Sequence, residues 1–259
     1  MLRVLASAVR HRYLLGQLVR QLIIVQYRQS VLGLGWAVLQ PAIYTGIFLV
    51  LRSVVPIPSD GIPYPLFALA GMTGWGTFAT AVTVGSASIV LNAAIIRKVY
   101  FPRELFPAAA VLTRALDFGV GLVMLAAMMA YYRAPVTWHI LWVPFLFACQ
   151  TLFSLAISLV AAALGAFKRD FVLGMPFLLQ FGTFVSPVIY PLSAVPEAYR
   201  ALYLLNPMAG LIESYRRVLL RGLPPEPVVI ASSILSTLVL LELSCAVFKR
   251  LEMKFADVI

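Results

Sequence analysis

Residues 91–105, with the sequence LNAAIIRKVYFPREL, separate two long apolar runs, each of which is long enough to cross a bilayer as a helix. The stretch combines the cations Arg97, Lys98 and Arg103 with large apolar side chains. A plain connection between two membrane helices needs only a short polar turn. We therefore interpret this stretch as a surface that another protein contacts.

The composition on either side of this stretch predicts an all-α integral membrane protein. Hydrophobic residues make up 62% of the chain and charged residues 12%, against about 45–50% and 25% in a soluble domain, and the mean hydropathy is +0.95. The chain contains no long polar block that could form a separate soluble domain. The apolar runs predict six transmembrane helices, at about residues 32–54, 65–90, 106–132, 138–166, 171–191 and 228–248.

The net charge of +10 does not indicate nucleic-acid binding, because the cations cluster at the ends of apolar runs and not on one solvated face. Six crossings place both termini and residues 91–105 on one side. That side collects 13 of the 20 lysines and arginines, the other side collects six, and Arg114 lies inside a span. Positive loops face the cytoplasm, so we expect both termini to be cytoplasmic.

Residues 10–28 have the pattern of an amphipathic helix that lies on the membrane surface, with leucine, isoleucine and valine on one arc opposite glutamine and arginine. A soluble helix packed on a domain core is the alternative interpretation. We divide the chain into a cytoplasmic N-terminal segment, residues 1–30, and a transmembrane domain, residues 31–259.

Residues 192–220 are too charged to span a membrane and too apolar to be freely solvated. We expect two short helices that dip back into the outer half of the membrane and form an outer gate, since Asn206 before Pro207 is a helix-start signal. A solvated loop is the alternative. The candidate gate residues are Pro196, Tyr199, Asn206, Pro207, Glu213 and Arg216.

The sequence shows no catalytic or metal-binding apparatus. Its two histidines, His11 and His139, lie far apart in the sequence, and Cys149 and Cys245 each lie inside an apolar run. No glycine-rich phosphate loop is followed by a lysine. We therefore expect no catalytic residue, no metal site and no cofactor on this chain.

Two sets of residues inside the spans are candidates for transport. Arg114 and Asp117 lie three residues apart on one helix, close enough to form an ion pair within the membrane, although such a pair is more often structural than part of a transport route. Aromatic rings can stack on the apolar faces of sugars, although such residues also pack helices together. The candidate channel residues are Trp36, Tyr44, Phe48, Phe78, Phe181, Phe184 and Tyr190.

Four segments together resemble the permease subunit of type-2 ABC exporters that move lipid-linked polysaccharides such as O-antigen and teichoic acid. They are YRQSVLGLGWAVLQP (27–41), IIRKVYFPRELFP (95–107), SPVIYPLSAVPEAYR (186–200) and LNPMAGLIESYRRVLL (205–220). Each segment alone is a weak signal, but their order, spacing and hydropathy match over nearly the whole chain.

This resemblance implies a homodimer of six-span subunits in a bacterial inner membrane, with a channel between the two copies. Each copy would bind a separate cytoplasmic ATPase subunit that carries ATP and Mg²⁺, so the chain itself would not be an enzyme. Residues 92–104 would form the coupling helix seated on that ATPase. The implied coupling residues are Ile95, Ile96, Arg97, Lys98, Val99, Tyr100, Phe101, Arg103 and Glu104.

The resemblance implies export of an undecaprenyl-phosphate-linked polysaccharide, an O-antigen, with ATP-driven movement of the coupling helices opening the channel. Capsule, teichoic acid, or a small drug or lipid are alternative substrates within the same fold. A membrane-embedded sugar transferase is a different class, and it would need acidic or histidine groups that converge at one membrane face. The ten acidic residues here are scattered.

Overall fold

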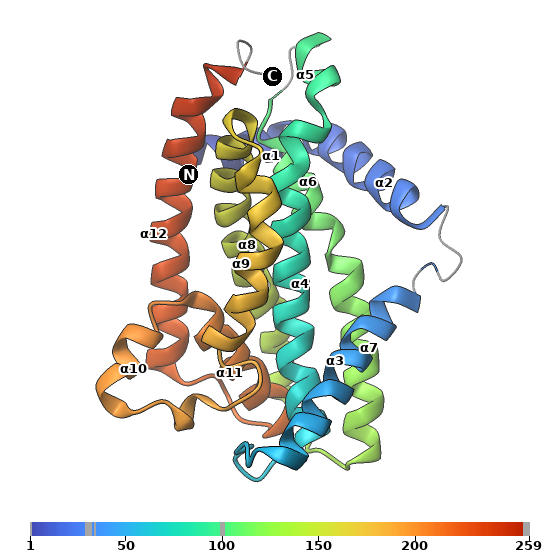
Figure 1. Cartoon of the computed structure of the whole chain (residues 1–259), viewed down its shortest axis with the longest axis vertical. Helices are drawn as coiled ribbons and strands as arrows, with labels where there is room; N and C mark the ends of the chain where they lie inside the picture. Colours follow the sequence, from blue (N-terminus) through green and yellow to red (C-terminus); the bar gives the residue numbers. More distant parts are fainter. Residues whose placement is uncertain (1, 29–32, 34, 99–101, 256–259) are drawn as a thin grey trace.

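The computed structural model describes residues 2–28, 33, 35–98 and 102–255, and within these ranges all regular structure is helical (Figure 1). The long helices are α3 (Gly35–Val54), α4 (Tyr64–Leu91), α7 (Ala115–Tyr131), α8 (Trp142–Phe167) and α12 (Pro227–Glu252). The shorter ones are α1 (Leu2–Arg10), α2 (Arg12–Arg28), α5 (Ala93–Lys98), α6 (Leu105–Thr113), α9 (Asp170–Val185), α10 (Glu197–Tyr203) and α11 (Pro207–Leu220). Two 3-10 turns, η1 (Trp138–Leu141) and η2 (Leu192–Ala194), complete the order.

Five helical segments of the described chain are long and apolar enough to cross a membrane. They correspond to five of the six predicted spans, with α6 and α7 forming one segment and η1 and α8 another. The remaining predicted span, residues 171–191, is represented by α9, which has only 16 residues. Its end has a local cause: Ser186 precedes Pro187, which disfavours helical geometry, and Ser186 has an extended ψ of 154°.

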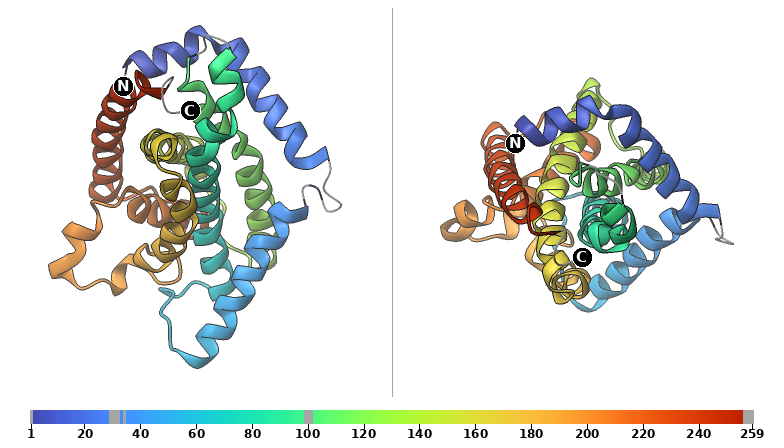
Figure 2. Two further views of the ribbon diagram at one scale, coloured as in Figure 1. Left: turned by 45° about the horizontal axis from the view of Figure 1, so that its top comes forward. Right: turned by 90° about the horizontal axis from the view of Figure 1, so that it is seen from above.

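Helix α4 is the centre of the molecule. Most of its residues are buried, as expected for a helix surrounded by others, and it packs against α3, α6, α7, α8, α9 and α11. The view from above places it inside the ring of the other helices (Figure 2). The closest packing uses small residues, because a Cβ added at Gly85 would lie 2.3 Å from Oγ of Ser158 on α8.

The N-terminal segment is helical as predicted, but it forms two helices that meet at His11. Helix α2 covers most of the predicted residues 10–28 and packs against α6. Helix α1 was not anticipated. Figure 1 shows both chain ends and α5 at one end of the molecule, with α10 and α11 near the other. Most of the segments that carry the 13 cations therefore lie toward this end, while α2 runs from it toward the middle of the molecule.

The contact between α4 and α8 yields a test of the fold. Gly85→Ala should lower the free energy of unfolding by about 1–3 kcal/mol, because the new methyl group overlaps Ser158. Gly119→Ala on α7 is the matched control, since an added Cβ there meets nothing within 4 Å. Thermal unfolding of the two variants in detergent measures the difference. Equal midpoints would show that α4 and α8 are not packed this closely.

Candidate functional site

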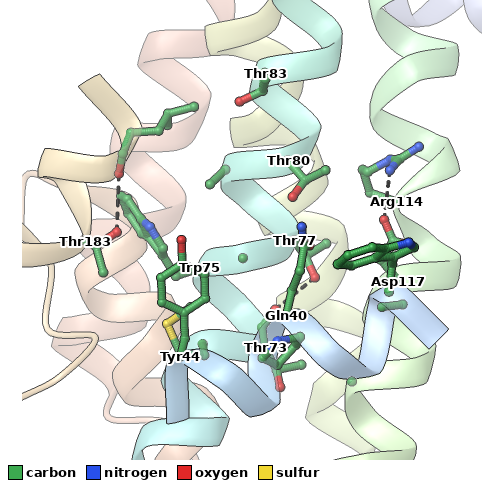
Figure 3. Close-up of a pocket in the computed structure, with 18 of the residues that line it drawn as sticks. Gln40, Tyr44, Thr73, Trp75, Thr77, Thr80, Thr83, Arg114, Asp117 and Thr183 are labelled. Carbon is green, nitrogen blue, oxygen red and sulfur yellow. Dashed lines mark hydrogen bonds and ion pairs between the residues drawn. The ribbon is translucent and has the colours of Figure 1, made fainter. Parts of the chain in front are cut away.

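A cleft of about 700 Å³ lies between α3, α4, α7 and α9, and the end of α2 reaches it (Figure 3). Helix α3 forms one wall and α9 another, while α4 forms the floor between them. The lining mixes aromatic rings with hydroxyl and amide groups. This cleft is the candidate path for a substrate, because the helices predicted to carry the channel aromatics all meet there.

Four of the seven predicted channel aromatics line this cleft: Trp36, Tyr44, Phe48 and Phe184. Trp36 and Tyr44 are about half exposed, at 49% and 45%, so their rings are available to a ligand. Trp75 also lines the cleft, and its indole packs closely against Gly182 on α9. A Cβ atom at Gly182 would lie 2.7 Å from the indole ring.

The other three predicted aromatics do not line the cleft. Phe78 on α4 is buried, and its ring stacks parallel to that of Phe153 on α8 at a centroid distance of 5.0 Å. Phe181 is on the exposed side of α9 and contacts Phe177. The hydroxyl of Tyr190 donates to the carbonyl of Phe184 at 2.9 Å, so the Tyr190 side chain contacts the last turn of α9.

A row of threonines on α4, which we did not identify from the sequence, gives the cleft its polar floor: Thr73, Thr77, Thr80 and Thr83. The first two donate to helix carbonyls, at 2.9 and 2.8 Å. The hydroxyls of Thr80 and Thr83 have no hydrogen-bond partner within the described part of the chain. The spacing of three or four residues was the available signal, because it places all four on one helix face.

The predicted ion pair between Arg114 and Asp117 is confirmed, with Nη1 and Oδ2 2.9 Å apart. Both residues line the cleft. The other nitrogens of Arg114 donate to Oγ1 of Thr113 at 3.1 Å and to the side-chain oxygen of Gln26. A guanidinium with 5% exposure is stabilised by such contacts, which compensate for its lost hydration.

Arg216 on α11 is the centre of the predicted gate segment and is 1% exposed. Its guanidinium donates to the carbonyls of Pro187, Val188 and Tyr190, with 2.6 Å to Pro187. It also donates to the carbonyl of Phe67 at 3.3 Å and lies 3.5 Å from the centre of that ring. Burial lowers the pKa of Arg216 to about 10, so it stays charged at neutral pH.

The other gate residues occupy three kinds of position. Asn206 caps α11 by accepting from the backbone N–H of Met208 at 3.1 Å, with Pro207 in the first turn, as the sequence predicts. Its amide also donates to Ser186 at 2.9 Å, which ties α11 to the end of α9. Pro196 precedes α10, Tyr199 on that helix is 64% exposed, and Glu213 lies partly buried on α11.

The predicted coupling segment divides into an exposed part and an anchored part. Arg97 and Lys98 are exposed at the end of α5, and Ile95 is 40% exposed, whereas Ile96 is buried. Val99, Tyr100 and Phe101 lie outside the described residues.

The anchored part comprises residues of the predicted coupling segment that bind to the rest of the chain. Arg103 donates to the carbonyl of Glu252, and Glu104 is 2% exposed and binds Nζ of Lys249 at 2.9 Å. Burial alone raises the pKa of Glu104, but hydrogen bonds from Lys249, its own backbone and Ser7 outweigh it and lower the pKa. The carboxylate therefore joins the base of the segment to α12.

The comparisons with known proteins agree with this architecture. The family model described as "ABC-2 type transporter" matches residues 13–220. The O-antigen export system permease protein RfbA of Myxococcus xanthus is 32% identical over 99% of both chains, and RfbA of Klebsiella pneumoniae is 28% identical over 97% of this chain and all of that one. The polysialic acid transport protein KpsM of Escherichia coli is 25% identical over 85% of this chain and 86% of its own.

The contacts of Arg216 yield a prediction about the gate segment. Arg216→Met should lower the free energy of unfolding by at least about 3 kcal/mol, because several buried carbonyls lose their donor. The neighbouring Arg217→Met is the control, since Arg217 keeps 31% of its side chain exposed. Thermal unfolding in detergent compares the two. A similar loss in both variants would mean that Arg216 does not hold residues 187–190.

Proposed function

The chain belongs to the ABC-2 type transporter family, and we propose that it is the permease of an exporter that moves lipid-linked O-antigen polysaccharide across the bacterial inner membrane. The observation that carries this proposal is the match with O-antigen export permeases over nearly the full length of both chains. The cleft adds the chemistry that a polysaccharide needs, since rings and hydroxyl groups share one surface.

The wall formed by α3 supports assembly as a homodimer. In the most apolar stretch of α3, only 11% of the residues are buried within the chain itself. The corresponding share is 61% for the segment that contains α8. A membrane channel for a glycan needs polar walls that are shielded from lipid on all sides. We infer that a second copy covers the open side between α3 and α9 and turns two clefts into one channel.

Energy would enter through α5 from a separate ATPase subunit bound to each copy. Arg97 and Lys98 offer two exposed cations beside the partly exposed Ile95, which suits a partner with an acidic rim and an apolar floor. The ion pair between Glu104 and Lys249 supports a rigid connection from this segment to α12. ATP and Mg²⁺ would act on the ATPase, and the permease would form no covalent bond with the glycan.

The distribution of charge supports an orientation with both termini in the cytoplasm. The end of the molecule that holds α5 and both termini carries most of the cations, in agreement with the positive-inside rule. In this orientation α10 and α11 lie at the outer end, where they close the channel.

A capsule polysaccharide is the second candidate substrate, because KpsM is named as a polysialic acid transport protein and covers most of this chain. A drug or small lipid fits less well. The floor of the cleft is a row of threonines, and apolar molecules gain nothing from hydroxyl groups that they must desolvate.

Transport in reconstituted vesicles tests the proposal. The purified permease and its ATPase are incorporated with a radiolabelled lipid-linked O-antigen glycan, and movement of the glycan across the bilayer is followed with and without ATP. Movement should require ATP, the permease and the ATPase together. Glycan that crosses equally well without ATP, or fails to cross in the complete system, would contradict the assignment.

The exposed part of the coupling segment gives a sharper prediction. Changing Arg97 and Lys98 together to Glu should lower ATP-dependent export by at least about tenfold, because like charges then face the acidic rim expected on the ATPase. The same double change at Lys168 and Arg169, exposed at the start of α9 at the same end, is the matched control. An equal loss in the control would attribute the effect to general charge and not to α5.

A further inference from the structure

The cleft is electrically neutral. Among the described residues that line it, only Arg114 and Asp117 have charged side chains, and these form an ion pair at 2.9 Å. In a homodimer the second copy would contribute the same residues and again no net charge. This contrasts with the whole chain, whose net charge is +10.

We propose that this neutral lining makes the exporter selective for polysaccharides of uncharged sugars and excludes polymers that carry a carboxylate on each unit. The inference rests on the proposed function and names the class of glycan that the same cleft accepts. It separates this chain's substrate from a polyanion such as polysialic acid, the polymer in the name of KpsM.

Arg114 is the one cation among the described residues that line the cleft, and its charge is already compensated within the chain. Nε, Nη1 and Nη2 already donate to Thr113, Asp117 and Gln26. A carboxylate that approached Arg114 would also lie close to Asp117, whose charge already compensates the guanidinium at 2.9 Å. Moving an unpaired carboxylate from water into a channel lined by protein is costly, and a polymer with a carboxylate on each unit repeats this cost along its length, whereas a lipid phosphate occurs only at its end.

The remaining polar groups suit sugar hydroxyls. A sugar hydroxyl donates one hydrogen bond and accepts others, and the hydroxyls of Thr80 and Thr83 have the same dual capacity. The amides of Gln40 and Gln180 also line the cleft and offer both donors and acceptors. An ionised carboxylate can only accept, so it leaves the acceptor side of each of these groups unused.

The rings complete this selectivity. Trp36 and Tyr44 line the cleft from α3, and the labelled threonines line it from α4 (Figure 3). The face of an aromatic ring is the negative side of its quadrupole. It attracts the C–H faces of a neutral sugar and repels a carboxylate.

The test compares three polymers of equal length on the same lipid: a neutral hexose polymer, a uronic acid polymer, and the methyl ester of that acid. The methyl ester removes the charge and nearly preserves the shape. In vesicles with the ATPase, the parent should export the neutral polymer and the ester at similar rates. It should export the acid at least about tenfold more slowly, a ratio that corresponds to about 1.4 kcal/mol.

A variant reverses the expectation. Thr80→Arg adds an unpaired cation to the cleft and should raise the rate for the acid relative to the neutral polymer several-fold. Val136→Arg adds the same charge at a side chain that is 70% exposed outside the cleft, and should leave the ratio unchanged. The parent's own ratio remains decisive if Thr80→Arg fails to fold.

The possible outcomes separate this inference from the proposed function. Equal ATP-dependent export of the acid and its ester by the parent would overturn the selectivity and leave glycan export intact. Failure to export any of the three polymers in the complete system would overturn the proposed function and the inference with it. Slow export of both the acid and the ester would assign the discrimination to shape, which also contradicts a selection by charge.

Discussion

The end of the bundle that holds α10 and α11 depends on how the carbonyl groups of residues 187–190 are hydrogen-bonded. A backbone that leaves its helix near a membrane must still find hydrogen-bond donors, because lipid supplies none. Arg216 provides them to Pro187, Val188 and Tyr190 from the neighbouring helix α11. This contact allows α9 to stop at Val185 and brings α10 and α11 back across the end of the bundle.

Helix α4 contributes both to the packed core and to the cleft. One of its faces is built for tight packing, with Gly85 against Ser158 of α8. Another face carries the threonine row and stays open because α3 and α9 stand to either side of it. A single central helix thus serves as a structural core and as the floor of the cleft. Close packing behind the floor holds the backbone of α4 in place, and a pre-organised site loses less entropy when a ligand binds.

The sequence predicts the class of fold well, because hydropathy over 20 residues reports directly on burial in a membrane. It also predicts the pair of Arg114 and Asp117, whose spacing of three is a local property of a helix, and the start of α11 at Pro207. It does not predict that Arg216 and Glu104 are buried, since their partners lie 29 and 145 residues away in the chain. The threonine row was missed for another reason: each threonine alone barely lowers the hydropathy of its span.

The most direct test of the account is to detect the glycan in the cleft during transport. A photoreactive benzophenone residue replaces Tyr44 on α3, or Val239 on α12 as a control that is 50% exposed outside the cleft. Vesicles that contain the ATPase and a radiolabelled neutral glycan are irradiated with and without ATP. The account predicts ATP-dependent labelling of the permease from position 44 and none from position 239. Labelling from both positions alike, or from neither while export proceeds, would show that the glycan does not pass through this cleft.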